Sequence, residues 1–226
     1  MRQLLKYDIT LQWRQGFWLI YFIVTFIYLV ILFNIPTANR LYVSLLFIIS
    51  DTSVLGIMFT GALILLEKQQ NVLQSLFVSP LRLTDYLLSK TISLTCIALC
   101  MSVLLYVLPN GIDPYFFIVL FVVLANSFIF TLIGLGVSIR VHTLNQYIAM
   151  LVFSSIFIIT PVVPFLIFDQ PLSLLFFPMN AAIDLIMIGF TEVEIWRIFI
   201  DAGSLIIWML LALMFAKKQF KAIIYK

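Results

Sequence analysis

Residues 17–35 read FWLIYFIVTFIYLVILFNI, an apolar run that contains no Asp, Glu, Lys or Arg. A bilayer core about 30 Å thick is crossed by about 20 helical residues, so this run is long enough to span it. Five similar runs follow, and the six predicted spans are 17–35, 43–66, 86–108, 115–139, 147–168 and 196–216. Each is expected to be helical, because a helix satisfies its own backbone groups in hydrocarbon. The pattern predicts an all-α integral membrane protein with six transmembrane helices, in a single domain over residues 1–226.

The composition agrees with a membrane environment. Of the 226 residues, 64% are hydrophobic and only 10% are Asp, Glu, Lys or Arg. A soluble domain keeps about a quarter of its residues charged to cover its surface. The missing charge indicates that lipid covers most of this chain.

The basic residues indicate how the chain is oriented, because Lys and Arg are retained on the cytoplasmic side during insertion. Only Arg40 and Arg197 fall on the opposite side. The others lie in the N-terminal segment, the loop after the second span, the loop after the fourth span and the C-terminal tail: Arg2, Lys6, Arg14, Lys68, Arg82, Lys90, Arg140, Lys217, Lys218, Lys221 and Lys226. Both termini are therefore expected in the cytoplasm of a multi-pass protein of the cell membrane, and we expect that membrane to be a bacterial plasma membrane.

Two segments outside the spans are expected to lie at the membrane surface. Leu5, Ile9, Trp13 and Phe17 recur every four residues, which predicts an interfacial helix over 1–16; a plain extension of the first span is the alternative. Residues 170–194 are apolar but are interrupted near Pro178. A seventh span there would carry the C-terminal lysines outward, so we predict an extracellular re-entrant hairpin in the outer leaflet.

The loop over residues 67–85 contains an amphipathic pattern. Its apolar residues share one helical face, and Pro80 ends the helix near Val78. Such a short helix between two spans can dock a partner and move both spans. An ordinary interfacial loop is the alternative.

The segment from Glu67 to Lys90 resembles the first cytoplasmic loop of type-2 ATP-binding-cassette exporter permeases. The resemblance rests on Glu67-Lys68, Leu73 and Leu76, Ser79-Pro80-Leu81, and Tyr86-Leu87-Leu88-Ser89-Lys90, and the layout of spans also agrees. Family members commonly have Gly and Thr where this chain has Asn71 and Val72. The resemblance implies a coupling helix seated in a groove of the ATPase, with these candidate residues: Glu67, Lys68, Gln70, Asn71, Gln74, Ser75, Leu76, Phe77, Pro80 and Arg82. It also implies lighter ATPase contact by the loop around Arg140, His142, Asn145 and Gln146.

The chain lacks the parts of an enzyme or an ATPase. It has no P-loop motif and one histidine, His142, which we interpret as a solvated residue and not a metal ligand. We therefore expect no catalytic residue, metal or cofactor in this chain. ATP and Mg would be bound by ABC ATPase subunits, two per complex. The other expected partners are a second permease copy or a sibling permease, and membrane lipid. Nucleic acid is not an expected partner.

Polar residues within the spans are candidates for lining the translocation pathway: Asp51, Asn126, Thr131 and Asp201, with Ser127 beside them. A charged Asp near mid-membrane costs about 2.5–3.5 kcal/mol, so each acid needs a partner or a wet cavity, or must reach the interface, as Asp201 can. The small residue Gly56 suggests close helix packing or a dimer seam on the second span.

These features favour an exporter permease for hydrophobic or amphipathic cargo. An ion-gradient-driven secondary transporter and a non-transporting membrane scaffold are the alternatives.

Overall fold

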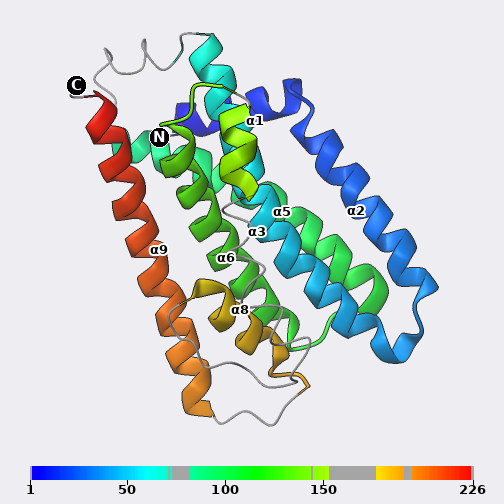
Figure 1. Ribbon diagram of the computed structural model, residues 1–226. Coiled ribbons are helices and arrows are strands. Elements are labelled where there is room, and N and C mark those ends of the chain that lie inside the picture. The colour runs from blue at the N-terminus through cyan, green and yellow to red at the C-terminus, as the bar shows by residue number, and fades with distance from the viewer. Residues whose placement is uncertain are drawn as a thin grey trace.

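The computed structural model of the chain describes residues 2–70, 72, 82–143, 145–152, 177–190 and 195–224. Within these residues it forms seven bounded helices and no strand (Figure 1): α1 (Arg2–Arg14), α2 (Phe17–Asn34), α3 (Thr37–Gln69), α5 (Leu83–Asn110), α6 (Phe116–Ser138), α8 (Pro178–Met187) and α9 (Ile195–Ile224). Five of them, namely α2, α3, α5, α6 and α9, are long and apolar enough to cross a membrane. The protein is thus an all-α membrane protein, as predicted.

Several predicted elements lie partly or wholly outside the described residues. The fifth predicted span, 147–168, is described only to residue 152, where residues 145–152 are helical. The predicted coupling helix falls in the undescribed part of the loop after α3. The predicted hairpin over 170–194 is described only from 177 to 190, which includes α8.

Helix α6 lies at the centre of the bundle and packs against α3, α5, α8 and α9 (Figure 1). Its side chains Val122, Ala125, Ile129 and Leu132 are almost fully buried. In contrast, α2 and α9 expose many large apolar side chains, such as Phe26. An apolar outer surface around a packed interior is what a helix bundle in lipid requires.

Three helices, α3, α5 and α9, extend beyond the predicted spans, whereas α2 and α6 match theirs to within one residue at each end. Helix α3 has 33 residues, which is about 50 Å of helix, and α9 continues through the lysines of the C-terminal segment. A hydropathy pattern marks the part of a helix that lies in hydrocarbon, whereas the polar ends have no proline or glycine to stop them. Helix α8 is short, with 10 residues, and Pro178 is its first residue, a position where its missing N–H costs nothing.

Small residues bring α3 and α6 together. A Cβ atom built on Gly134 would lie 2.1 Å from Thr60 Oγ1, and one on Gly56 would lie 3.4 Å from Thr131 Oγ1. Gly56 is buried and faces α6 of the same chain. Gly56 itself therefore serves packing within one chain, and a dimer seam elsewhere on the second span stays a prediction.

Helix α1 is separate from α2 and lies across the end of the bundle that carries both chain termini, called the terminal end below (Figure 1). The break is at Gly16, whose φ of 77° belongs to the left-handed region that favours glycine. The chain therefore does not form a plain extension of the first span.

Candidate functional site

The strongest cluster of charged side chains joins α1, α3 and α5 at the terminal end of the bundle. Lys90 Nζ on α5 donates to Glu67 Oε1 at the end of α3, and lies 3.1 Å from Asp8 Oδ1 on α1. Tyr86 donates its hydroxyl to Glu67 Oε2 at 2.6 Å, and Ser89 donates to Asp8 Oδ2 at 2.5 Å. We call these five residues the ion cluster.

The ion cluster is buried. Lys90 and Glu67 are each 1% exposed, and Asp8 is 6% exposed. Removing one partner from a buried ion pair leaves an uncompensated charge and costs about 3–5 kcal/mol. The three helices are therefore tied together at this point, and Gln12 adds a further link from α1 by donating to Ser93 Oγ at 2.7 Å.

Next to Glu67, Lys68 ties α3 to α6. Its Nζ donates to Ile139 O at 2.6 Å and also to the carbonyl oxygens of Ser138 and Val141. These carbonyls lie at and just beyond the C-terminal end of α6, where free acceptors and the helix dipole favour a cation. The last turn of α3 is thus fixed on two sides.

These contacts join the two helices that flank the loop after α3, because Glu67 at the end of α3 binds Lys90 on α5. Among the predicted coupling residues, Glu67 and Lys68 point into the protein, whereas Gln70 and Arg82 are exposed. The other candidates lie outside the described residues: Asn71, Gln74, Ser75, Leu76, Phe77 and Pro80. A push or pull on the loop would reach α3 at Glu67 and α5 at Lys90.

Two of the predicted pathway residues lie in the contact between α3 and α6. Asn126 Nδ2 donates to Ser53 Oγ at 2.8 Å and to Thr52 Oγ1 at 3.0 Å. Thr131 faces Gly56, as described above, and its hydroxyl has no hydrogen-bond partner among the described residues. Ser127 faces another helix, and donates to Thr95 on α5 at 3.4 Å.

The two predicted acids lie elsewhere and apart from each other. Asp51 is 3% exposed and is close enough to Tyr21 and Tyr28 of α2 to interact with them electrostatically. Asp201 is buried near the start of α9, where Asp184 of α8 and Arg197 lie within electrostatic range. Burial, reinforced by the charge of Asp201, raises the pKa of Asp184 to about 6. The structure therefore does not bring the four predicted pathway residues into one site.

Sequence reasoning missed most of the ion cluster. The sequence places Asp8 in the predicted interfacial helix, and it uses Lys90 as an orienting charge and as part of the family resemblance, without joining the two residues. A usable signal was present, because Lys90 lies inside the predicted span 86–108, and a cation in an apolar run needs a partner. Tyr147 was missed as well: its hydroxyl donates to Met58 O at 2.9 Å, and its ring lies against Gly61.

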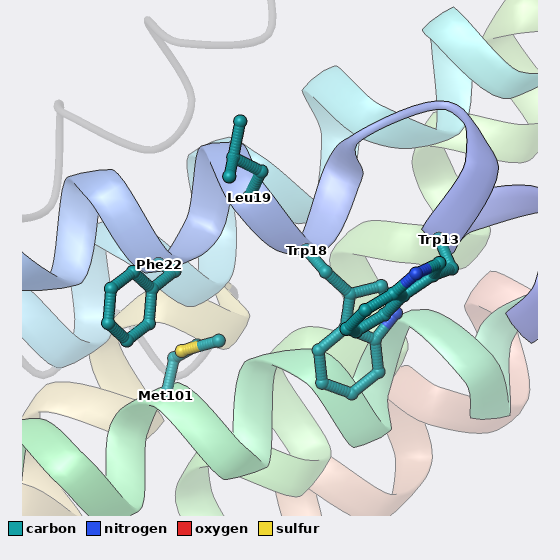
Figure 2. A pocket seen from close by; sticks show the side chains of 5 residues that line it. All are labelled: Trp13, Trp18, Leu19, Phe22 and Met101. Atoms are coloured by element: carbon teal, nitrogen blue, oxygen red, sulfur yellow. The ribbon is translucent and has the colours of Figure 1, made fainter.

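A pocket of about 370 Å³ lies where α1 turns into α2, beside α5. In Figure 2, Trp13 and Trp18 lie together, and Phe22 and Met101 face each other further along α2. The centroids of the two indole rings are 5.9 Å apart. With Leu19 as the remaining lining residue, the pocket suits a hydrocarbon or aromatic group.

The segment after α6 contains His142, which is exposed and whose backbone N–H donates to Gln146 Oε1 at 3.1 Å. This contact closes a local turn.

Known proteins resemble this chain over most of its length. The model of the fluoroquinolones export permease protein family matches residues 1–226. Two curated relatives, named fluoroquinolones export permease proteins, come from the strains CDC 1551 / Oshkosh and ATCC 25618 / H37Rv of Mycobacterium tuberculosis. Each is 24% identical over 160 residues, which is 70% of this chain and 68% of the relative.

Proposed function

Because the chain belongs to the fluoroquinolones export permease protein family, we propose that it is the permease subunit of an ATP-driven exporter whose ATPase is a separate polypeptide. The two termini, and with them the loop after α3, would face the cytoplasm. Two ATPase subunits would dock there, and a second permease, identical or related, would complete the pathway.

The observation that carries this proposal is the ion cluster. It lies where the loop leaves α3 and returns to α5, and it holds α1 against both helices. A partner that binds the loop would therefore move the ends of α1, α3 and α5 together. Closure of the ATPases would shift the terminal ends of α3 and α5 together and change the packing of α3 against α2 and α6.

The cargo is proposed to be amphipathic and aromatic, entering from the cytoplasm or the inner leaflet. The names of the two relatives support fluoroquinolones as a first choice. The apolar pocket at the turn between α1 and α2 is consistent with cargo that arrives through the lipid (Figure 2).

The test is reconstitution with an ATP-binding-cassette ATPase that co-purifies with the chain, and measurement of norfloxacin transport into inverted vesicles. We expect transport to require ATP and to persist when a protonophore collapses the ion gradient. Replacing Leu76 and Phe77 together by Asp should abolish ATPase binding, whereas the conservative pair Leu76→Met with Phe77→Leu should retain it. Normal ATPase binding and transport by the double Asp variant would overturn the coupling assignment.

A second candidate function is secondary transport driven by an ion gradient. The buried carboxyl of Asp51 favours it, because such carriers keep coupling acids within the membrane. In the vesicle experiment this alternative predicts transport without ATP that stops when the protonophore is added. A scaffold without transport activity would show neither response.

A further inference from the structure

A polar layer lies between α2 and α3, midway along their contact. The two helices run antiparallel, and aromatic pairs set their register: Tyr21 contacts Phe59 with ring centroids 4.8 Å apart, and Tyr28 stacks on Phe47 at 4.5 Å. Thr25 lies between the two tyrosines, and Asp51 lies between the two phenylalanines.

The polar groups of this layer are buried, and they have no hydrogen-bond partner within the part of the chain that the structure describes. Thr25 is 2% exposed and Asp51 is 3% exposed. Among the described residues, the two carboxylate oxygens of Asp51 have no hydrogen-bond partner, and the hydroxyl of Thr25 has none either. Polar groups buried in this way normally find a partner, and an unpaired acid within a membrane usually marks a functional site.

We propose that Asp51 and Thr25, between the rings of Tyr21, Tyr28, Phe47 and Phe59, bind the positive charge of an aromatic organic cation. The carboxylate supplies the counter-charge, and aromatic faces attract a cation through their quadrupole. The Thr25 hydroxyl can accept a hydrogen bond from an N–H of the cation.

That this cation is cargo rests on the proposed export function; that it binds here does not. Helix α2 covers the layer from outside: most of its residues are exposed, whereas α3 packs mainly against α6 and little against α2. The end of α3 carries Glu67 and Lys68, which anchor the loop. A shift of α3 caused at the loop would therefore open or close the layer against α2.

The experiment measures binding, so that it does not depend on export. The full chain, together with its ATPase where the two co-purify, is placed in nanodiscs of zwitterionic lipid. Fluorescence titrations then give the Kd of ethidium, a planar aromatic cation, and of N-phenyl-1-naphthylamine, a neutral aromatic of similar size. Asp51→Asn is compared with Asp113→Asn, which removes the same charge from an exposed position.

We expect Asp51→Asn to weaken ethidium binding at least tenfold and to change binding of the neutral probe less than twofold. Thr25→Val should weaken ethidium binding by a smaller factor, and Asp113→Asn should leave it unchanged. Thermal unfolding of each variant reports whether the chain is still folded. Equal loss of both probes in Asp51→Asn, or ethidium binding equal to that of the wild type, would overturn the inference. If the wild-type complex shows no ATP-dependent transport while ethidium binding depends on Asp51 as expected, the proposed function is wrong and the binding site stands.

Discussion

Replacing Lys90 by Met tests how firmly the ion cluster holds the bundle. The substitution keeps the length of the side chain but leaves the carboxylates of Asp8 and Glu67 buried without the cation between them. Loss of one partner from a buried pair costs about 3–5 kcal/mol. For a chain of this size 1 kcal/mol shifts the Tm by about 2–4 °C, so we expect the Tm to fall by about 6–20 °C.

The assay is thermal unfolding of the purified protein in detergent, followed by the fluorescence of its tryptophans. Lys221→Met is the matched control, because Lys221 is exposed on α9 and should change the Tm by less than about 2 °C. A triple variant, with Asp8→Asn, Glu67→Gln and Lys90→Met, removes all three charges and should recover most of the lost stability. If Lys90→Met unfolds at the wild-type temperature, the cluster does not hold the helices together and the reasoning is refuted.

Three other substitutions have direct expectations. Gly61→Ala places a Cβ atom 1.7 Å from the ring of Tyr147 and should destabilise the protein by about 1–3 kcal/mol in the same assay. Adding Tyr147→Ala should restore the stability. The control is Gly203→Ala, whose Cβ meets no atom within 4 Å and which should not destabilise the protein. Lys68→Met removes the cation from the end of α6, and should cost about 1–2 kcal/mol by denaturant or thermal unfolding; an unchanged stability would show that the carbonyls are satisfied without it. Since burial raises the pKa of Asp184 above its unfolded value, this carboxyl favours the folded state at low pH and loses that contribution as the pH rises to about 6. Asp184→Asn should thus raise the Tm at pH 7.5 but not at pH 4, and an equal effect at both pH values would contradict the assignment.

The length of the apolar runs was sufficient to locate most of the membrane helices. Helices α2, α3, α5, α6 and α9 cover five of the six predicted spans to within one residue at each end, because runs of apolar residues leave no other structure in lipid. Their ends were less predictable. Helix α3 extends to Gln69 because no proline or glycine stops it, and hydropathy does not report on that.

The candidate site was harder to predict, because it depends on which helices face one another. Glu67 was identified through its place at the start of the loop, but the lysine that it binds lies on α5, 23 residues after it, and the second acid on that lysine lies on α1, 59 residues before it. Nothing in the spacing of Asp8 shows that it meets Lys90. In the same way, Asp51 was selected as an acid within a span, whereas its position against α2 follows only from the aromatic pairs that set the register.

The central claim is that the ion cluster passes the motion of the ATPases from the loop to α3 and α5. The most direct measurement is the ratio of norfloxacin transported to ATP hydrolysed by the reconstituted complex that carries the triple neutral variant. We predict that this variant, folded and bound to the ATPase, hydrolyses ATP but transports at least tenfold less drug per ATP than the wild type. A wild-type ratio in the same folded complex would contradict the claim.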